Sequence, residues 1–231
     1  MRSILRAFVL LVISVPLSLT VQGAGLESLS DRDASGGLRE ALTQGAGHAV
    51  QMLGAKDGFL RNKKVRIPLP DGLAQVEPVM RMAGRGQDLD DLVKTMNRAA
   101  EAAVPEAQTL LVDAVKQMSV EDARKILAGG DDSATRYFKS KTQPQLTERF
   151  LPIVKRSTDR LALSEQYNKL AGQAASFGLV KGEDAQIEGY VTRKALDGLY
   201  LMIAEEEKAI RKNPMQAAGS LAQKAFGLLG R

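Results

Sequence analysis

The sequence contains no cysteine and only one histidine, His48, in 231 residues. The absence of cysteine excludes disulfides, lipid-modified cysteine, cysteine nucleophiles and cysteine-ligated zinc. A single histidine excludes metal sites that need two or three imidazoles, and a Ser-His-Asp triad would depend on His48 alone. No glycine-rich phosphate-binding loop is present either. We therefore predict no metal ion and no cofactor, and the residue inventory favours a protein that is not an enzyme.

Aromatic residues are also scarce, at 4% of the chain, and tryptophan is absent. The core must therefore be built mainly from leucine, isoleucine, valine, alanine and methionine, a composition that suits packed helices better than a β-sandwich. The formal net charge is only +5, and the basic residues are not interleaved with aromatic side chains on which bases could stack. We therefore expect no nucleic-acid partner.

Residues 1–23 are typical of a secretory signal peptide. Arg2 and Arg6 precede an uncharged apolar run over residues 7–19, and small residues before Ala24 permit cleavage there. The run is shorter than the roughly 20 apolar residues that span a bilayer, which argues against a permanent anchor. The sequence therefore predicts a periplasmic protein that is secreted by a cleaved N-terminal signal.

Helical periodicity dominates the mature chain, residues 24–231, in which we find no internal repeat, low-complexity tract or inter-domain linker. We expect a single all-α domain with a bundle-like arrangement. The exception lies near residues 58–70, where Pro68 and Pro70 keep their predecessors out of the helical conformation, so that a short extended or hairpin segment is expected. Pro105 is expected to bend a long helix. The helices are expected at about residues 35–53, 71–84, 88–118, 119–129, 132–141, 142–161, 164–177, 183–211 and 215–229.

The stretch MNRAAEAAV places Asn97, Arg98 and Glu101 on a helix that is otherwise built mainly of alanine. Asn97 and Glu101 fall at the edge of the apolar stripe of this helix and beyond it, and Arg98 lies almost opposite the stripe. The small neighbouring alanines leave room for another helix to approach closely. The trio is therefore a solvated surface with an Arg98–Glu101 pair, a buried clasp between helices, or an active site, and we favour the first two.

Glu206 is the predicted partner of this trio. It falls within the inward stripe of the helix expected at residues 183–211, whereas Glu205 and Glu207 fall outside it. A buried carboxylate needs a cation or a proton, because desolvation disfavours its charge. We therefore predict a contact between Arg98 and Glu206 across two helices, which makes the trio and Glu206 one candidate polar cluster. We favour a structural ion pair over a catalytic role for it.

A second candidate site follows the glycine break GGDD. Thr135, Arg136, Tyr137 and Lys139 are the residues that could bind an anion or another ligand near the start of a helix. The alternative is that Tyr137 and Phe138 anchor a short helix to the core, while the basic side chains are solvated.

Four longer stretches occur in the order DGFLRNKKVRIPLP, MNRAAEAAVPEA, DAVKQMSVEDARKILAGGDDSATRYFKSKT and LDGLYLMIAEEEKAIRKNP. Together they resemble the bacterial family catalogued as domain of unknown function 4197, and the resemblance runs from about Ser35 to Phe226. It implies an exported, largely helical protein and supplies no activity. Both candidate sites lie within these stretches, which makes their residues targets for mutagenesis.

Three functional hypotheses follow. The leading one is a non-enzymatic periplasmic protein that binds an envelope protein or a small ligand, because the chain has an export signal and few catalytic residue types. The alternative is a carboxylate-dependent hydrolase that acts on cell-wall glycan, with Glu101 or Glu206 as the acid. The third is a peripheral membrane protein that attaches through the amphipathic helix expected at residues 215–229.

Overall fold

The computed structural model describes residues 31–176, 185–214, 223 and 225, which form packed helices with no strand among them. The all-α prediction is therefore confirmed for this part of the chain. The predicted signal peptide and most of the predicted final helix lie outside the described residues, and the single-domain assignment stays a prediction. The helices are α1 (Asp31–Gly54), α2 (Asp71–Met82), α3 (Gly86–Ala103), the 3₁₀ helix η2 (Val104–Glu106), α4 (Ala107–Lys116), α5 (Val120–Ala128), α6 (Ser133–Thr158), α7 (Ala162–Ser176) and α8 (Ile187–Lys212).

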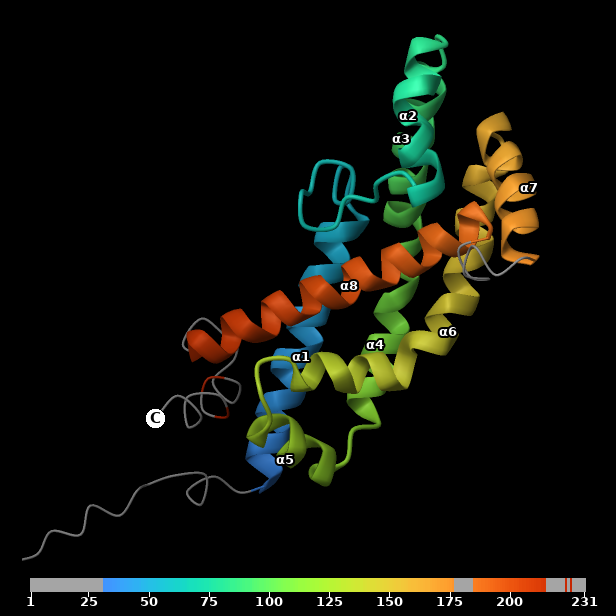
Figure 1. Ribbon diagram of the computed structural model, residues 1–231. Coiled ribbons are helices and arrows are strands. Elements are labelled where there is room, and N and C mark those ends of the chain that lie inside the picture. Colours follow the sequence, from blue (N-terminus) through green and yellow to red (C-terminus); the bar gives the residue numbers. More distant parts are fainter. Residues whose placement is uncertain (1–30, 177–184, 215–222, 224, 226–231) are drawn as a thin grey trace, which may run out of the picture.

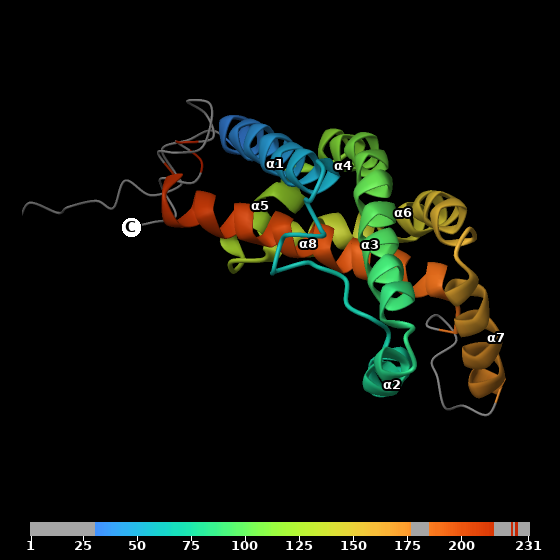
Figure 2. The same ribbon diagram turned by 90° about the horizontal axis from the view of Figure 1, so that it is seen from above.

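Helix α8 runs across α1 and α3 and also packs on α6, so that it ties the other helices together (Figures 1 and 2). The buried apolar side chains between these helices form one continuous cluster. The few aromatic residues contribute strongly to it, since three of the six phenylalanines are completely buried. The largest fully buried side chains are Phe59, Phe138, Phe150, Leu38, Leu53, Ile67, Leu89, Leu92, Met96, Leu111 and Met118.

The prolines affect the helices in two different ways. The sequence predicts that Pro105 bends one long helix, and the helix is instead interrupted there, because this residue lies in η2 between α3 and α4. The predicted helix boundary near Thr142 is wrong, because α6 continues through it with Pro144 and Pro152 inside. The Thr142 hydroxyl donates to the Phe138 carbonyl oxygen at 2.7 Å and lies 2.9 Å from the Tyr200 hydroxyl on α8. Packing against neighbouring helices thus keeps α6 helical on both sides of its prolines. Figure 1 shows that the helix is bent.

The segment at residues 55–70 is an ordered loop rather than a hairpin, with turns up to Val65 and an irregular stretch from residue 66 to 70. It packs directly on α8 at Gly198. A Cβ atom at this glycine would lie 2.8 Å from the Phe59 ring and 3.2 Å from the Val65 Cβ atom. Only a residue without a side chain therefore lets the loop and α8 approach so closely.

Helix α2 is the least packed of the helices. Leu73 is its only buried residue, whereas Val76, Val79 and Met82 are exposed, Met82 by 82%. Together with the start of α3 it extends beyond the main body (Figure 1). Within the described ranges, no helix combines the length and the apolarity that crossing a bilayer requires.

Candidate functional site

Asn97 is completely buried, and its side chain binds the backbone of the loop. Its amide nitrogen donates to the carbonyl oxygens of Ile67 at 2.8 Å and Val93 at 2.7 Å, and its Oδ1 atom accepts from the Ile67 N–H at 2.8 Å. The residue thus pairs with both backbone groups of Ile67, as a neighbouring strand would. Every polar atom of this amide is therefore used inside the fold.

Glu101 holds the other end of the same loop. Its Oε1 atom accepts from the N–H groups of Phe59 and Leu60, both at 3.1 Å, and its Oε2 atom lies 2.5 Å from Arg98 Nη1. Arg98 Nη2 donates to Asp57 Oδ1 at 2.6 Å. The hydrogen bond with Glu101 is the main cause that raises the pKa of Arg98; Asp57 adds to it and burial opposes it.

We call Asp57, Asn97, Arg98 and Glu101 the loop clasp. Asn97 and Glu101 are buried as a clasp requires, but the predicted clasp between two helices is not what they form, because they bind a loop. Asp57 itself has a φ angle of 71°, in the left-handed region that aspartate tolerates better than most residues. Its ion pair with Arg98 holds this residue, and thereby the first turn of the loop, in place.

The predicted contact between Arg98 and Glu206 is wrong. The Glu206 carboxylate lies 2.7 Å from His48 Nδ1 near the surface, with 25% of the Glu206 side chain exposed. The inward carboxylate of this helix is that of Glu207, which is only 3% exposed. The apolar stripe misled the prediction because the end of α8 meets the start of α6 and α5, which lie on the side of Glu207.

Glu207, although it belongs to α8, caps the N-terminus of α6. It accepts from the N–H groups of Ala134 and Thr135, both at 2.9 Å, and from the Thr135 hydroxyl at 3.0 Å. These are N–H groups that a helix start leaves without partners, and a negative charge there is favoured by the helix dipole. Arg211 completes the cluster: its Nη2 atom lies 2.9 Å from Glu207 Oε1 and 2.8 Å from the Ile126 carbonyl oxygen.

One signal in the sequence could have identified this cap. Glu207 and Arg211 stand four residues apart, the spacing of an ion pair on one helix face. In the structure, Asp132 precedes α6 without forming a capping hydrogen bond, so the start of α6 needs another acceptor, although an aspartate at this position suggested that it would cap the helix itself. What the sequence did not show was that the two elements meet.

The structure does not bring the four residues of the second candidate site together. Thr135 is buried against Glu207, Arg136 is exposed and pairs with Asp132, and Lys139 is exposed. Tyr137 lines one pocket, and Lys139 lines a different one. The alternative interpretation is confirmed for Phe138, which is completely buried in the core.

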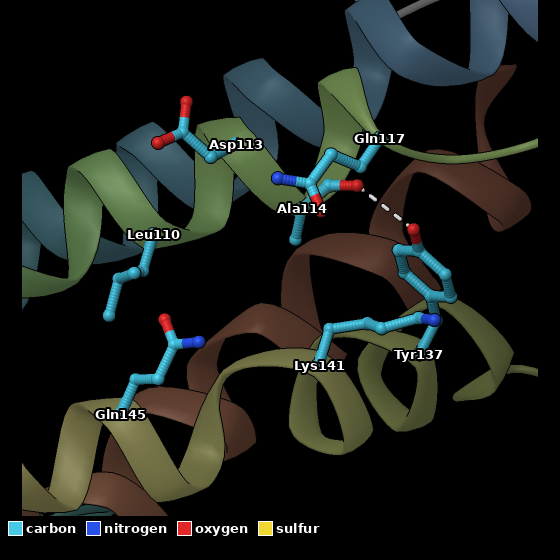
Figure 3. Close-up of a pocket in the computed structure, with 7 residues that line it drawn as sticks. All are labelled: Leu110, Asp113, Ala114, Gln117, Tyr137, Lys141 and Gln145. Atoms are coloured by element: carbon cyan, nitrogen blue, oxygen red, sulfur yellow. Dashed lines mark hydrogen bonds between the residues drawn. The ribbon is translucent and has the colours of Figure 1, made fainter.

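The pocket beside Tyr137 lies between α4 and α6 and has a volume of about 230 Å³ (Figure 3). The Tyr137 hydroxyl donates to the Ala114 carbonyl oxygen at 2.9 Å, and Lys141 Nζ lies 5.7 Å from the centre of the Tyr137 ring. Burial is the main cause that raises the pKa of Tyr137, and the charge of Asp122 adds to it. The residues that line this α4–α6 pocket are Leu110, Asp113, Ala114, Gln117, Tyr137, Lys141 and Gln145.

The loop held by the clasp carries a cluster of positive charge that the sequence analysis did not single out. Lys64 pairs with Glu205 at 2.5 Å, and Arg61 lies 3.5 Å from Asp57. The other cations of the loop have no ion-pair partner among the described residues. We call this segment, residues 56–66, the cationic loop; its exposed cations are Lys56, Arg61, Lys63, Lys64 and Arg66.

The fold and these clusters define an all-helical protein in which the buried carboxylates of Glu101 and Glu207 hold backbone segments in place. In the described part of the chain, no group of acidic and histidine side chains is arranged to hold a metal ion. The chain matches the family described as protein of unknown function (DUF4197) over residues 28–227, and it belongs to this family. Comparison with curated proteins found no match, and comparison with solved structures found none.

Proposed function

We propose that this protein is exported to the periplasm and acts there without catalysis, as a binding protein that recognises an acidic protein partner through the cationic loop. The observation that carries this proposal is the combination of exposed cations on the loop with a buried clasp that fixes its backbone. A fixed arrangement of charges loses less conformational entropy on binding than a flexible one, and complementary charge selects the partner.

The geometry gives the hydrolase hypothesis no comparable support. Both oxygens of Glu101 are already engaged, by two backbone N–H groups and by Arg98. Glu206 is partly open to solvent and paired with His48. A general acid in glycoside hydrolysis needs a sheltered carboxyl that is free to reach the leaving group, and neither residue offers one.

Export leads to a direct prediction. When the gene is expressed with its own leader in a Gram-negative host, we expect the periplasmic fraction to contain a chain that starts at Ala24, because the signal pattern places cleavage before this residue. The intact mass of the purified chain measures this. A variant that lacks residues 2–23 is the control and should stay in the cytoplasm. A full-length chain that remains in the cytoplasm would contradict export.

The cationic loop is tested by changing Lys56, Arg61, Lys63 and Arg66 together to glutamine. All four are exposed, so the fold should persist. We expect about tenfold weaker retention of acidic partners, because each exposed charge contributes a few tenths of a kcal/mol. The measurement is quantitative mass spectrometry of envelope proteins retained on the immobilised mature chain, at low and at physiological salt.

The matched control removes the same charge elsewhere, by changing Lys139, Arg149, Arg156 and Arg160 to glutamine. These residues are also exposed and lie on or directly after α6. The control should retain the same acidic proteins as the wild type. An equal loss of retention in both variants would mean that only net charge matters. Unchanged retention by the loop variant would mean that the partner binds elsewhere. Either result overturns the proposal.

A further inference from the structure

The α4–α6 pocket is separate from the loop clasp and from the cationic loop. Some of the polar side chains that line it form no hydrogen bond or ion pair with other described residues. Figure 3 shows Leu110 and Gln117 extending from α4, while Tyr137, Lys141 and Gln145 come from α6 on the other side. Its volume of about 230 Å³ is below the range of roughly 300–1,000 Å³ that is usual for drug-sized ligands. The pocket therefore fits a small molecule.

The charge that this pocket offers to a ligand is positive. Lys141 has no ion-pair partner among the described residues, and its ammonium group lies over the Tyr137 ring. Asp113 pairs at 3.1 Å with Lys116, and Figure 3 shows its carboxylate turned away from Lys141. Asp122 lies close enough for Lys141 to help lower its pKa, but its carboxylate is engaged mainly by Ser119, which is the principal cause of that shift.

Two amides and two apolar surfaces complete the pocket. The side chains of Gln117 and Gln145 form no hydrogen bond with other described residues, so each amide is available to donate to an anionic oxygen. The Tyr137 hydroxyl is committed to the Ala114 carbonyl oxygen and offers only its ring to a ligand. This ring lies beside the Lys141 ammonium group, and Leu110 adds apolar surface at the other side of the pocket.

We propose that the α4–α6 pocket binds a small organic anion with a carboxylate on a short aliphatic chain. The carboxylate pairs with Lys141 beside the Tyr137 ring, and the chain extends along the pocket past the amides of Gln117 and Gln145 toward Leu110. An ionised acceptor strengthens the hydrogen bond from Lys141, whereas a neutral amide of the same shape would lose the ion pair. The site is independent of the acidic partner proposed for the cationic loop.

The test is an NMR titration of the ¹⁵N-labelled mature chain with butyrate at fixed ionic strength. We expect saturable shifts of the backbone amide signals of Gln117, Tyr137 and Gln145. Butyramide has the same shape without the charge and should bind about tenfold more weakly. Inorganic phosphate has charge without the chain and should also bind more weakly than butyrate; equal binding of phosphate would overturn the apolar contact and thus the proposed ligand class.

Two variants separate the pocket from general charge effects. Lys141→Gln should weaken butyrate binding by about tenfold, because it removes the ion pair. Lys139→Gln changes an exposed lysine on the same helix that does not line this pocket, and it should leave the affinity unchanged. Absence of saturable shifts with butyrate, or the same affinity in wild type and Lys141→Gln, would overturn the proposal.

Discussion

Replacing Glu207 with alanine is expected to lower the free energy of unfolding by about 3–5 kcal/mol. The change leaves the N–H groups of Ala134 and Thr135 without their acceptor at the buried start of α6. It also removes the carboxylate that pairs with Arg211, whose side chain is only 11% exposed. Urea denaturation of the mature chain measures the effect, provided that the slope with denaturant stays the same.

The neighbouring residue provides a matched control. Glu206→Ala removes a carboxylate from the same turn of α8, but its pair with His48 is at the surface, with 61% of the histidine side chain exposed. We expect a loss below about 1 kcal/mol, because exposed ion pairs contribute little to stability. Similar losses in the two variants would contradict the structural role of the Glu207 cap.

The second large effect is expected for Glu101→Ala, with a loss of about 2–4 kcal/mol, because two backbone N–H groups of the loop lose their acceptor and Arg98 loses one of its two carboxylates. Unfolding of this variant should begin locally, in the loop that Glu101 holds. Hydrogen exchange should show protection lost first at Phe59 and Leu60, while amides in the middle of α6 and α8 keep theirs.

Glu106→Ala is the control for this variant, because Glu106 is exposed on η2, at the end of α3. Its effect should stay within about 0.5 kcal/mol, as is usual for surface substitutions. Unchanged protection of the loop amides in Glu101→Ala would show that the clasp does not hold the loop. The proposal for the cationic loop would then lose its main support.

The features that the sequence predicted well are those that depend on one helix at a time. The periodicity of apolar residues gave the all-α class, and the fixed φ angle and missing N–H of Pro105 located the irregularity between α3 and α4, although as a bend and not as a break. Small residues around Asn97 and Glu101 indicated that a clasp was possible there. These properties are local, because the neighbours along the chain determine them.

The features that the sequence predicted poorly depend on which helices and loops pack against each other. Asn97 and Glu101 bind backbone groups of a loop, and a loop has no periodicity from which its backbone direction could be inferred. Glu206 and Glu207 differ by only one position, so the choice between them required knowing what packs on the end of α8. The continuity of α6 through Pro144 likewise depends on packing with distant helices.

The close contact at Gly198 has a consequence for how this protein is made. The loop is encoded early in the chain, but the surface on which Phe59 and Val65 rest belongs to α8, which is synthesised more than a hundred residues later. A truncated polypeptide that stops before α8 would carry the same lysines and arginines without the support that arranges them. The arrangement of these charges therefore depends on contacts that exist only once the chain has been synthesised through α8.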